Sequence, residues 1–205
     1  MEDTEHNEES LENEIKVILL GNTGVGKTSM INVATGLAFK NDEVTSTASS
    51  FSEKEIEVNK KLYKIKIWDT IGQERLRQLT RIFYNNSKVV IFVYDITDRK
   101  SFDSLPSWVK DVEEKVGNEI IKGLVGNKMD LYLNEAVNLD EAEKYAHSIN
   151  AEFLAFSAKS YSAKLFKDFL DDLVKKYITK KGDGKKGRFS LSTNQTFRKK
   201  EKVCC

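Results

Sequence analysis

A glycine-rich segment, Gly21-Asn22-Thr23-Gly24-Val25-Gly26-Lys27-Thr28, follows directly on an apolar run at residues 15–20 and leads into a helical pattern at residues 28–35. This strand, G-x-x-x-x-G-K-[ST], helix context predicts a loop that wraps around phosphate groups. The backbone N–H groups and the helix N-terminus would face the anion, Lys27 would reach the β- and γ-phosphates, and the Thr28 hydroxyl would bind Mg²⁺. A chance glycine-rich turn is the alternative, and the flanking strand and the Lys-Thr pair argue against it. We expect these phosphate contacts: Thr23, Gly24, Val25, Gly26, Lys27, Thr28 and Ser29.

The rest of the chain alternates apolar runs with helical patterns, which indicates an α/β fold. The runs lie at residues 15–20, 65–68, 89–94, 121–125 and 153–156, and the helical patterns at residues 28–35, 76–85, 101–116, 139–148 and 163–177. Pro106 suits the start of the third helix. Residues 51–58 and 62–68 alternate in period two around Asn59-Lys60-Lys61, which predicts an antiparallel hairpin at the sheet edge. We therefore predict a six-stranded, mostly parallel sheet with one antiparallel edge strand and helices on both faces.

The charge distribution divides the 205 residues into one domain, at residues 15–178, and two tails. Residues 1–14 carry Asp and Glu but no Lys or Arg, which is typical of a disordered acidic arm. Residues 179–205 form a flexible tail that is strongly basic and holds both cysteines, Cys204 and Cys205, at its end. The longest apolar run, residues 89–94, is too short to cross a bilayer, and no secretory signal precedes it, so we expect a cytosolic protein.

Two polar segments are candidates for recognising the base of a bound nucleotide. Gly126-Asn127-Lys128-Met129-Asp130 follows the fourth of those runs, and Ser157-Ala158-Lys159 follows the fifth. A carboxylate at Asp130 can accept hydrogen bonds from guanine N1–H and the 2-amino group, a donor pair that adenine lacks. Asn-Lys-x-Asp alone could be an ordinary polar loop, but its register behind the phosphate loop favours a guanine site.

These segments resemble the guanine-binding motifs of the Ras superfamily of GTPases. The resemblance implies that Asn127 and Lys128 brace the site and cover the base, and that the Ala158 amide meets the guanine oxygen, with Ser157 and Lys159 beside it. It extends over residues 15–177 and implies the P-loop NTPase fold.

A further segment, Trp68-Asp69-Thr70-Ile71-Gly72-Gln73-Glu74, resembles the W-D-T-A-G-Q-E of Rab proteins. In that family pattern Asp69 holds Mg²⁺ through water, the Gly72 amide senses the γ-phosphate, and Gln73 orients the attacking water, with Lys27 as the third catalytic residue. The alternative is that Asp69 is a plain turn residue.

The chain departs from the family at two places. Where the family has T-I-G, this chain has Ser46-Thr47-Ala48, so the hydroxyl for Mg²⁺ would come from Ser46, with Thr45 and Thr47 as rivals. Ile71 replaces the family's alanine, and a β-branched side chain there restricts a peptide that must flip toward phosphate. Hydrolysis is therefore expected to be slow. Thr23 replaces a serine and keeps its hydroxyl.

Phe51, Trp68 and Phe83 match the aromatic trio that Rab proteins present to effectors, although the same residues could fill the core. Cys204-Cys205 resembles the doubly geranylgeranylated end of many Rab proteins; unmodified or palmitoylated cysteines are the alternatives. The Lys-rich segment of the tail could also touch nucleic acid, but it lacks the interleaved aromatic residues and the folded platform that would support this.

The sequence therefore predicts a monomeric Rab-like switch that binds GTP or GDP with Mg²⁺ and hydrolyses GTP in vesicle trafficking. The expected partners are effectors, an exchange factor, a GTPase-activating protein, a prenylation escort and a GDP-dissociation inhibitor. We expect it on the cytoplasmic face of endomembranes, with a cytosolic pool. Two alternatives are a GTP-binding interaction module with little hydrolysis and a phosphoryl-transfer enzyme acting on a small acceptor.

Overall fold

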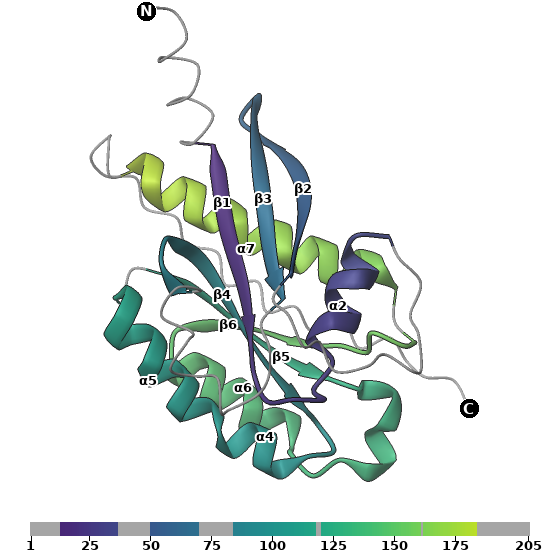
Figure 1. Ribbon diagram of the computed structural model, residues 1–205. Helices are drawn as coiled ribbons and strands as arrows, with labels where there is room; N and C mark the ends of the chain where they lie inside the picture. Colours follow the sequence, from purple (N-terminus) through teal and green to yellow (C-terminus); the bar gives the residue numbers. More distant parts are fainter. Residues whose placement is uncertain (1–12, 37–49, 70–83, 118–119, 161, 184–205) are drawn as a thin grey trace, which may run out of the picture.

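A single six-stranded sheet forms the centre of the computed structural model (Figure 1), which describes residues 13–36, 50–69, 84–117, 120–160 and 162–183. The strand order is β2-β3-β1-β4-β5-β6. The only antiparallel pair among these strands is β2–β3, and β2 lies at the edge. The predicted fold class is confirmed. The strands are β1 (Glu14–Leu20), β2 (Ser50–Val58), β3 (Lys61–Asp69), β4 (Ser87–Asp95), β5 (Ile121–Asn127) and β6 (Ala151–Ala155).

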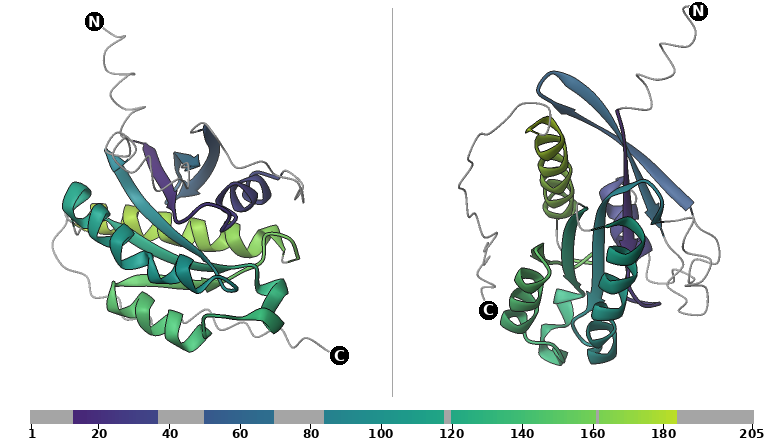
Figure 2. Two further views of the ribbon diagram at one scale, coloured as in Figure 1. Left: turned by 60° about the horizontal axis from the view of Figure 1, so that its bottom comes forward. Right: turned by 90° about the vertical axis from the view of Figure 1, so that its left-hand side faces the viewer.

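Helices lie on both sides of this sheet (Figure 2). Alternate residues of β1 explain the two layers, since Ile15, Val17 and Leu19 pack in one buried cluster and Ile18 and Leu20 pack in the other. The first cluster includes α2 (Lys27–Ala34) and α7 (Ala163–Asp183), and the second includes α4 (Arg99–Asp103), α5 (Leu105–Val116) and α6 (Leu139–Ser148). None of the described helices is long and apolar enough to span a membrane.

Most predicted elements differ from the structure by one or two residues at an end, and three differ in a way that matters for the fold. The helix predicted at residues 101–116 is two helices, α4 and α5, which meet at Ser104 because Pro106 in the first turn of α5 cannot donate an N–H to a continuing helix. The hairpin loop is Asn59-Lys60 alone, with φ of 53° and 63°, and Lys61 pairs with Val58. The last helix extends beyond residue 177 to Asp183, so the first residues of the predicted tail are helical.

The short 3₁₀ helix η2 (Met129–Asn134) had not been predicted. The predicted helix at residues 76–85 lies outside the described residues except at its last two positions.

The register of the parallel strands places the motif residues together at the carboxyl ends of the strands, which we call the carboxyl edge of the sheet. Leu19 pairs with Asp69 between β1 and β3, and Asp95 pairs with Asn127 between β4 and β5. The glycine-rich segment leaves β1 at the same edge, which is where ligands bind in open α/β sheets.

Candidate nucleotide-binding site

The glycine-rich loop joins β1 to α2, and close packing explains two of its glycines. A Cβ on Gly21 would lie 2.1 Å from the Val93 carbonyl oxygen. A Cβ on Gly26 would lie 2.3 Å from Asn127 Nδ2, and its φ of 95° is strained for any other residue. The backbone of the loop can therefore approach both β4 and the Asn127 loop only because side chains are absent at these positions.

Lys27 lies inside this loop. Its Nζ donates hydrogen bonds to the carbonyl oxygens of Gly21 and Asn22, both at 2.9 Å, and the residue is only 6% exposed. Burial lowers the pKa of the Lys27 ammonium to about 8, an effect that the nearby Asp69 carboxylate opposes. A phosphate in the loop would supply the negative charge that this buried ammonium needs.

Thr28 and Asp69 form the oxygen-rich side of the site. The Thr28 hydroxyl donates to Asp69 Oδ2 at 2.7 Å, although 41 residues separate the two in sequence. Asp69 is 3% exposed at the end of β3. A hydroxyl and a carboxylate beside a phosphate loop are the hard oxygen ligands that Mg²⁺ uses together with phosphate oxygens, so this donor set fits the metal. This contact also argues against Asp69 as a plain turn residue.

Asn127 links the phosphate loop to the predicted base site. Its Nδ2 donates to the Val25 carbonyl at 2.8 Å, and its Oδ1 accepts from the Ala158 amide at 3.2 Å. Asn127 is 2% exposed, so both halves of its amide are used inside the protein. One side chain thus fixes three segments that are far apart in sequence.

The other predicted base-site residues lie around Asn127. Ser157 donates its hydroxyl proton to Asp130 Oδ1 at 2.5 Å. Lys128, at a φ of 67°, directs its Nζ to Asp95 Oδ2 at 2.6 Å. Lys159 is exposed. The structure therefore brings the two predicted guanine segments together at the sheet edge, beside the phosphate loop.

Sequence reasoning missed two supports of this site. Asn22 Oδ1 accepts hydrogen bonds from Ser104 Oγ at 2.8 Å and from Trp108 Nε1 at 3.2 Å, which ties the phosphate loop to the junction of α4 and α5. Asp95 binds Lys128 with Oδ2 and, with Oδ1, accepts from the Thr97 amide at 2.9 Å and the Thr97 hydroxyl at 2.7 Å. Only the Asp95-x-Thr97 spacing after a strand offered a signal for the second support.

Two of the three aromatic residues predicted for effector binding, Phe51 and Trp68, lie in the part of the chain that the structure describes. Phe51 and Trp68 are cross-strand partners of β2 and β3 with ring centroids 5.2 Å apart, and Phe51 is 49% exposed. Lys16 Nζ lies 4.7 Å from the Trp68 ring centroid, and Lys66 Nζ lies 5.7 Å from that of Phe51. Phe51 therefore does not fill the core.

Several predicted residues lie outside the described part of the chain. They are Ser46 with its rivals Thr45 and Thr47, Ile71, Gly72, Gln73, Phe83, Cys204 and Cys205.

Comparison with known proteins agrees with this geometry. The Ras family model matches residues 16–178. Ras-related protein Rab-21 of Homo sapiens and of Bos taurus is 40% identical over 163 residues, which is 80% of this chain and 72% of the relative. Ras-related protein Rab-30 of Homo sapiens is 38% identical over 156 residues, which is 76% of each chain. The chain therefore belongs to the Ras family, as a Rab-like small GTPase that binds GTP and GDP with Mg²⁺, hydrolyses GTP and acts as a switch for effectors in vesicle trafficking.

Proposed function

We propose that the switch works through two groups of residues at the carboxyl edge of the sheet. Thr23, Gly24, Val25, Gly26, Lys27, Thr28 and Ser29 bind the phosphates, and Asn127, Lys128, Asp130, Ser157, Ala158 and Lys159 bind guanine. The observation that supports this assignment best is the Asn127 side chain, which bonds to both groups at once. It couples occupation of the base site to the position of the phosphate loop.

Lys27 is the catalytic cation of this proposal. Its Nζ, which donates to the carbonyl oxygens of Gly21 and Asn22, would donate to phosphate oxygens when phosphate enters. The exchange needs little reorganisation, because the ammonium is already desolvated and oriented.

Thr28, Asp69 and Ser46 are the proposed metal ligands, with Asp69 acting through water. When bound, Mg²⁺ neutralises charge that develops on the phosphate oxygens. The Thr28–Asp69 hydrogen bond holds these two oxygens in place before the metal arrives.

Gln73 orients the attacking water, and the Gly72 amide senses the γ-phosphate. An activating protein would add an arginine, worth roughly three to five decades in rate. Phe51, Trp68 and Phe83 form the proposed effector surface, for which the exposed Phe51 ring is the support.

The membrane half of the proposal rests on Cys204-Cys205, which we propose are geranylgeranylated with the help of an escort protein. A GDP-dissociation inhibitor would then maintain a cytosolic pool of a monomeric protein that otherwise lies on the cytoplasmic face of endomembranes. Two lipid chains beside a basic segment meet the requirement for stable but reversible anchoring. Residues 1–14 remain the proposed acidic arm, residues 15–178 the GTP-binding domain and residues 179–205 the tail.

The test is release of the γ-phosphate from GTP-preloaded protein after addition of Mg²⁺, with Gln73→Leu as the control. Slow release that Gln73→Leu abolishes is the expected result, and equal rates in the two proteins would refute the role of Gln73. Ile71→Ala is the third protein in the series. We expect it to release phosphate faster, because alanine leaves the peptide before Gly72 freer to turn toward the γ-phosphate.

A further inference from the structure

A pocket lies at the amino-terminal ends of β4 and β5, opposite the end of the sheet that holds the nucleotide residues. It has a volume of about 760 Å³ and lies where β4 begins at Ser87 and where Ile120 precedes β5. In an α/β fold the helices run back against the strands, so α5 and α7 end beside this pocket. Its lining consists of Tyr84, Asn85, Asn86, Ser87, Lys88, Lys115, Val116, Ile120, Tyr177, Lys180 and Lys181.

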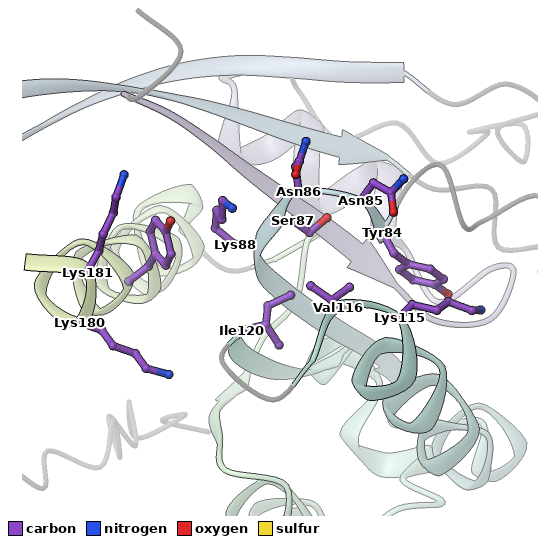
Figure 3. A pocket seen from close by; sticks show the side chains of 11 residues that line it. Tyr84, Asn85, Asn86, Ser87, Lys88, Lys115, Val116, Ile120, Lys180 and Lys181 are labelled. Atoms are coloured by element: carbon purple, nitrogen blue, oxygen red, sulfur yellow. The ribbon is translucent and has the colours of Figure 1, made fainter. Parts of the chain in front are cut away.

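Four lysines from three elements line the pocket, and none of its described lining residues is acidic. Figure 3 shows Lys180 and Lys181 on the α7 side, Lys115 beside Tyr84 on the α5 side, and Lys88 of β4 between them. Lys88 and Lys181 form no ion pair with any residue that the structure describes. The concentration of positive charge is notable in a chain whose formal net charge is only +1.

Ordinary structural roles explain part of this charge. Lys115 pairs with Asp111 at 3.9 Å and lies 4.8 Å from the Tyr84 ring centroid. Lysines in the last turns of α5 and α7 also offset the partial negative charges, about half a unit each, at the ends of these helices. The ammonium groups of Lys88 and Lys181 are then the ones left without an ionic partner among the described residues.

The size and charge of the pocket suit a phosphorylated polyol. A phosphomonoester carries about −1.5 to −2 at neutral pH, which complements the ammonium groups of Lys88 and Lys181. Lysine ammonium groups and the side-chain amides of Asn85 and Asn86 supply hydrogen-bond donors. A volume of about 760 Å³ gives this open pocket enough room for a small organic group such as a headgroup.

We propose that this pocket binds the phosphorylated headgroup of an anionic lipid. The site is at the end of α7, and the chain continues from there into residues 184–205, where Lys and Arg are frequent and the cysteine pair closes the sequence. The lipid source rests on the membrane attachment proposed above, because tethered lipid chains would keep this end of the domain within reach of a bilayer surface. A free phosphate would satisfy the same charges, but nothing would concentrate it near the end of α7.

The first measurement uses full-length, unlipidated, GDP-bound protein and glycerophosphoinositol phosphate, the soluble headgroup of phosphatidylinositol monophosphate. The pocket variant is Lys88→Ala/Lys181→Ala. The matched control is Lys110→Ala/Lys164→Ala, which removes two lysines whose side chains are 75% and 77% exposed on α5 and α7. We expect calorimetric titration to give at least about a tenfold loss of affinity in the pocket variant and less than about a twofold loss in the control. Equal losses in both variants would overturn the proposal, because they would indicate diffuse charge attraction.

The second measurement separates lipid from free phosphate. Phosphatidylcholine vesicles with phosphatidylinositol monophosphate are compared with vesicles of equal surface charge that contain phosphatidylserine. The proposal predicts a preference for the first vesicles that the pocket variant loses and the control keeps. Equal recruitment by both vesicles, or displacement of the headgroup by inorganic phosphate at equal affinity, would overturn the lipid assignment.

A separate experiment shows whether the proposed membrane attachment is wrong. Mass spectrometry of Cys204 and Cys205 from cells reports lipidation, whereas the headgroup titration uses protein without lipid. The pocket variant should also keep the wild-type rate of γ-phosphate release, since its lysines lie at the opposite edge of the sheet from the nucleotide residues.

Discussion

Trp108 holds the phosphate loop through one hydrogen bond, from its indole Nε1 to Asn22 Oδ1 at 3.2 Å. The backbone carbonyl of the same Asn22 accepts from Lys27, so α5 positions the Lys27 ammonium through a single residue. Trp108→Phe keeps an aromatic ring in the core but removes the donor. We expect GDP dissociation to become about threefold to tenfold faster, as loss of one hydrogen bond implies. Stopped-flow release of a fluorescent GDP measures it.

Because Trp108 is also 2% exposed in the core, Asn22→Ala serves as the second variant, leaving the indole in place. Both variants should accelerate dissociation, with less than additive effects when combined. A Trp108→Phe protein that loses stability but releases GDP at the wild-type rate would contradict the positioning role.

The depressed pKa of Lys27 predicts a pH dependence of nucleotide affinity. In the free protein this pKa is about 8, and bound phosphates favour the ammonium and raise it. Binding therefore takes up a proton above pH 8. The affinity for GDP should fall by up to about tenfold per pH unit above pH 8 and should be independent of pH below that value. Equilibrium titration across this range, with Lys27→Arg as the control, tests the sign, because arginine stays charged. If the affinity of the Lys27→Arg protein for GDP falls with pH in the same way, another titrating group is responsible.

Gly26→Ala should disrupt the junction of the phosphate loop with Asn127. The new Cβ would lie 2.3 Å from Asn127 Nδ2 at a φ of 95°, so a steric clash adds to backbone strain. Gly36→Ala is the matched control, since its φ is 89° and a Cβ there meets nothing within 4 Å. We expect Gly36→Ala to cost about 1–2 kcal/mol in the free energy of unfolding and Gly26→Ala clearly more. Urea unfolding compares them, and equal costs would show that Asn127 moves aside freely.

The Lys54–Asp171 ion pair joins β2 to α7 across 117 residues of sequence. Its side chains are only 22% and 23% exposed, whereas those of the Lys64–Glu53 pair are 47% and 40% exposed. Solvent screens the second pair more, so a double-mutant cycle to alanine should give about 0.5–1 kcal/mol of coupling for Lys54–Asp171 and less for Lys64–Glu53. The reverse order in urea unfolding would contradict this ranking.

Features of the fold and site can be predicted from the sequence when the residues that form them are close together along the chain. The phosphate loop, the strands and the helix over residues 139–148 depend on neighbouring residues, and periodicity and spacing reveal them. The sequence does not predict that the helix is interrupted at Ser104, because Pro106 is compatible with the first turn of any helix. Only the observed bounds show that a new helix, α5, starts at Leu105. The contacts of Asn22 with Trp108 and of Lys128 with Asp95 join side chains 86 and 33 residues apart, and no local pattern encodes such pairs.

The length of α7 has a geometrical consequence. Its 21 residues form one helix about 30 Å long, which starts close after Ala158 at the nucleotide edge and ends beside the lysine pocket. The helix packs on the sheet through Phe166, Leu170 and Val174, so it acts as a rigid spacer. In the membrane attachment proposed above, a bilayer that meets the domain at Asp183 would be about one domain depth away from the nucleotide residues. Soluble proteins could then reach the nucleotide side of the domain without competing with the lipid surface for space.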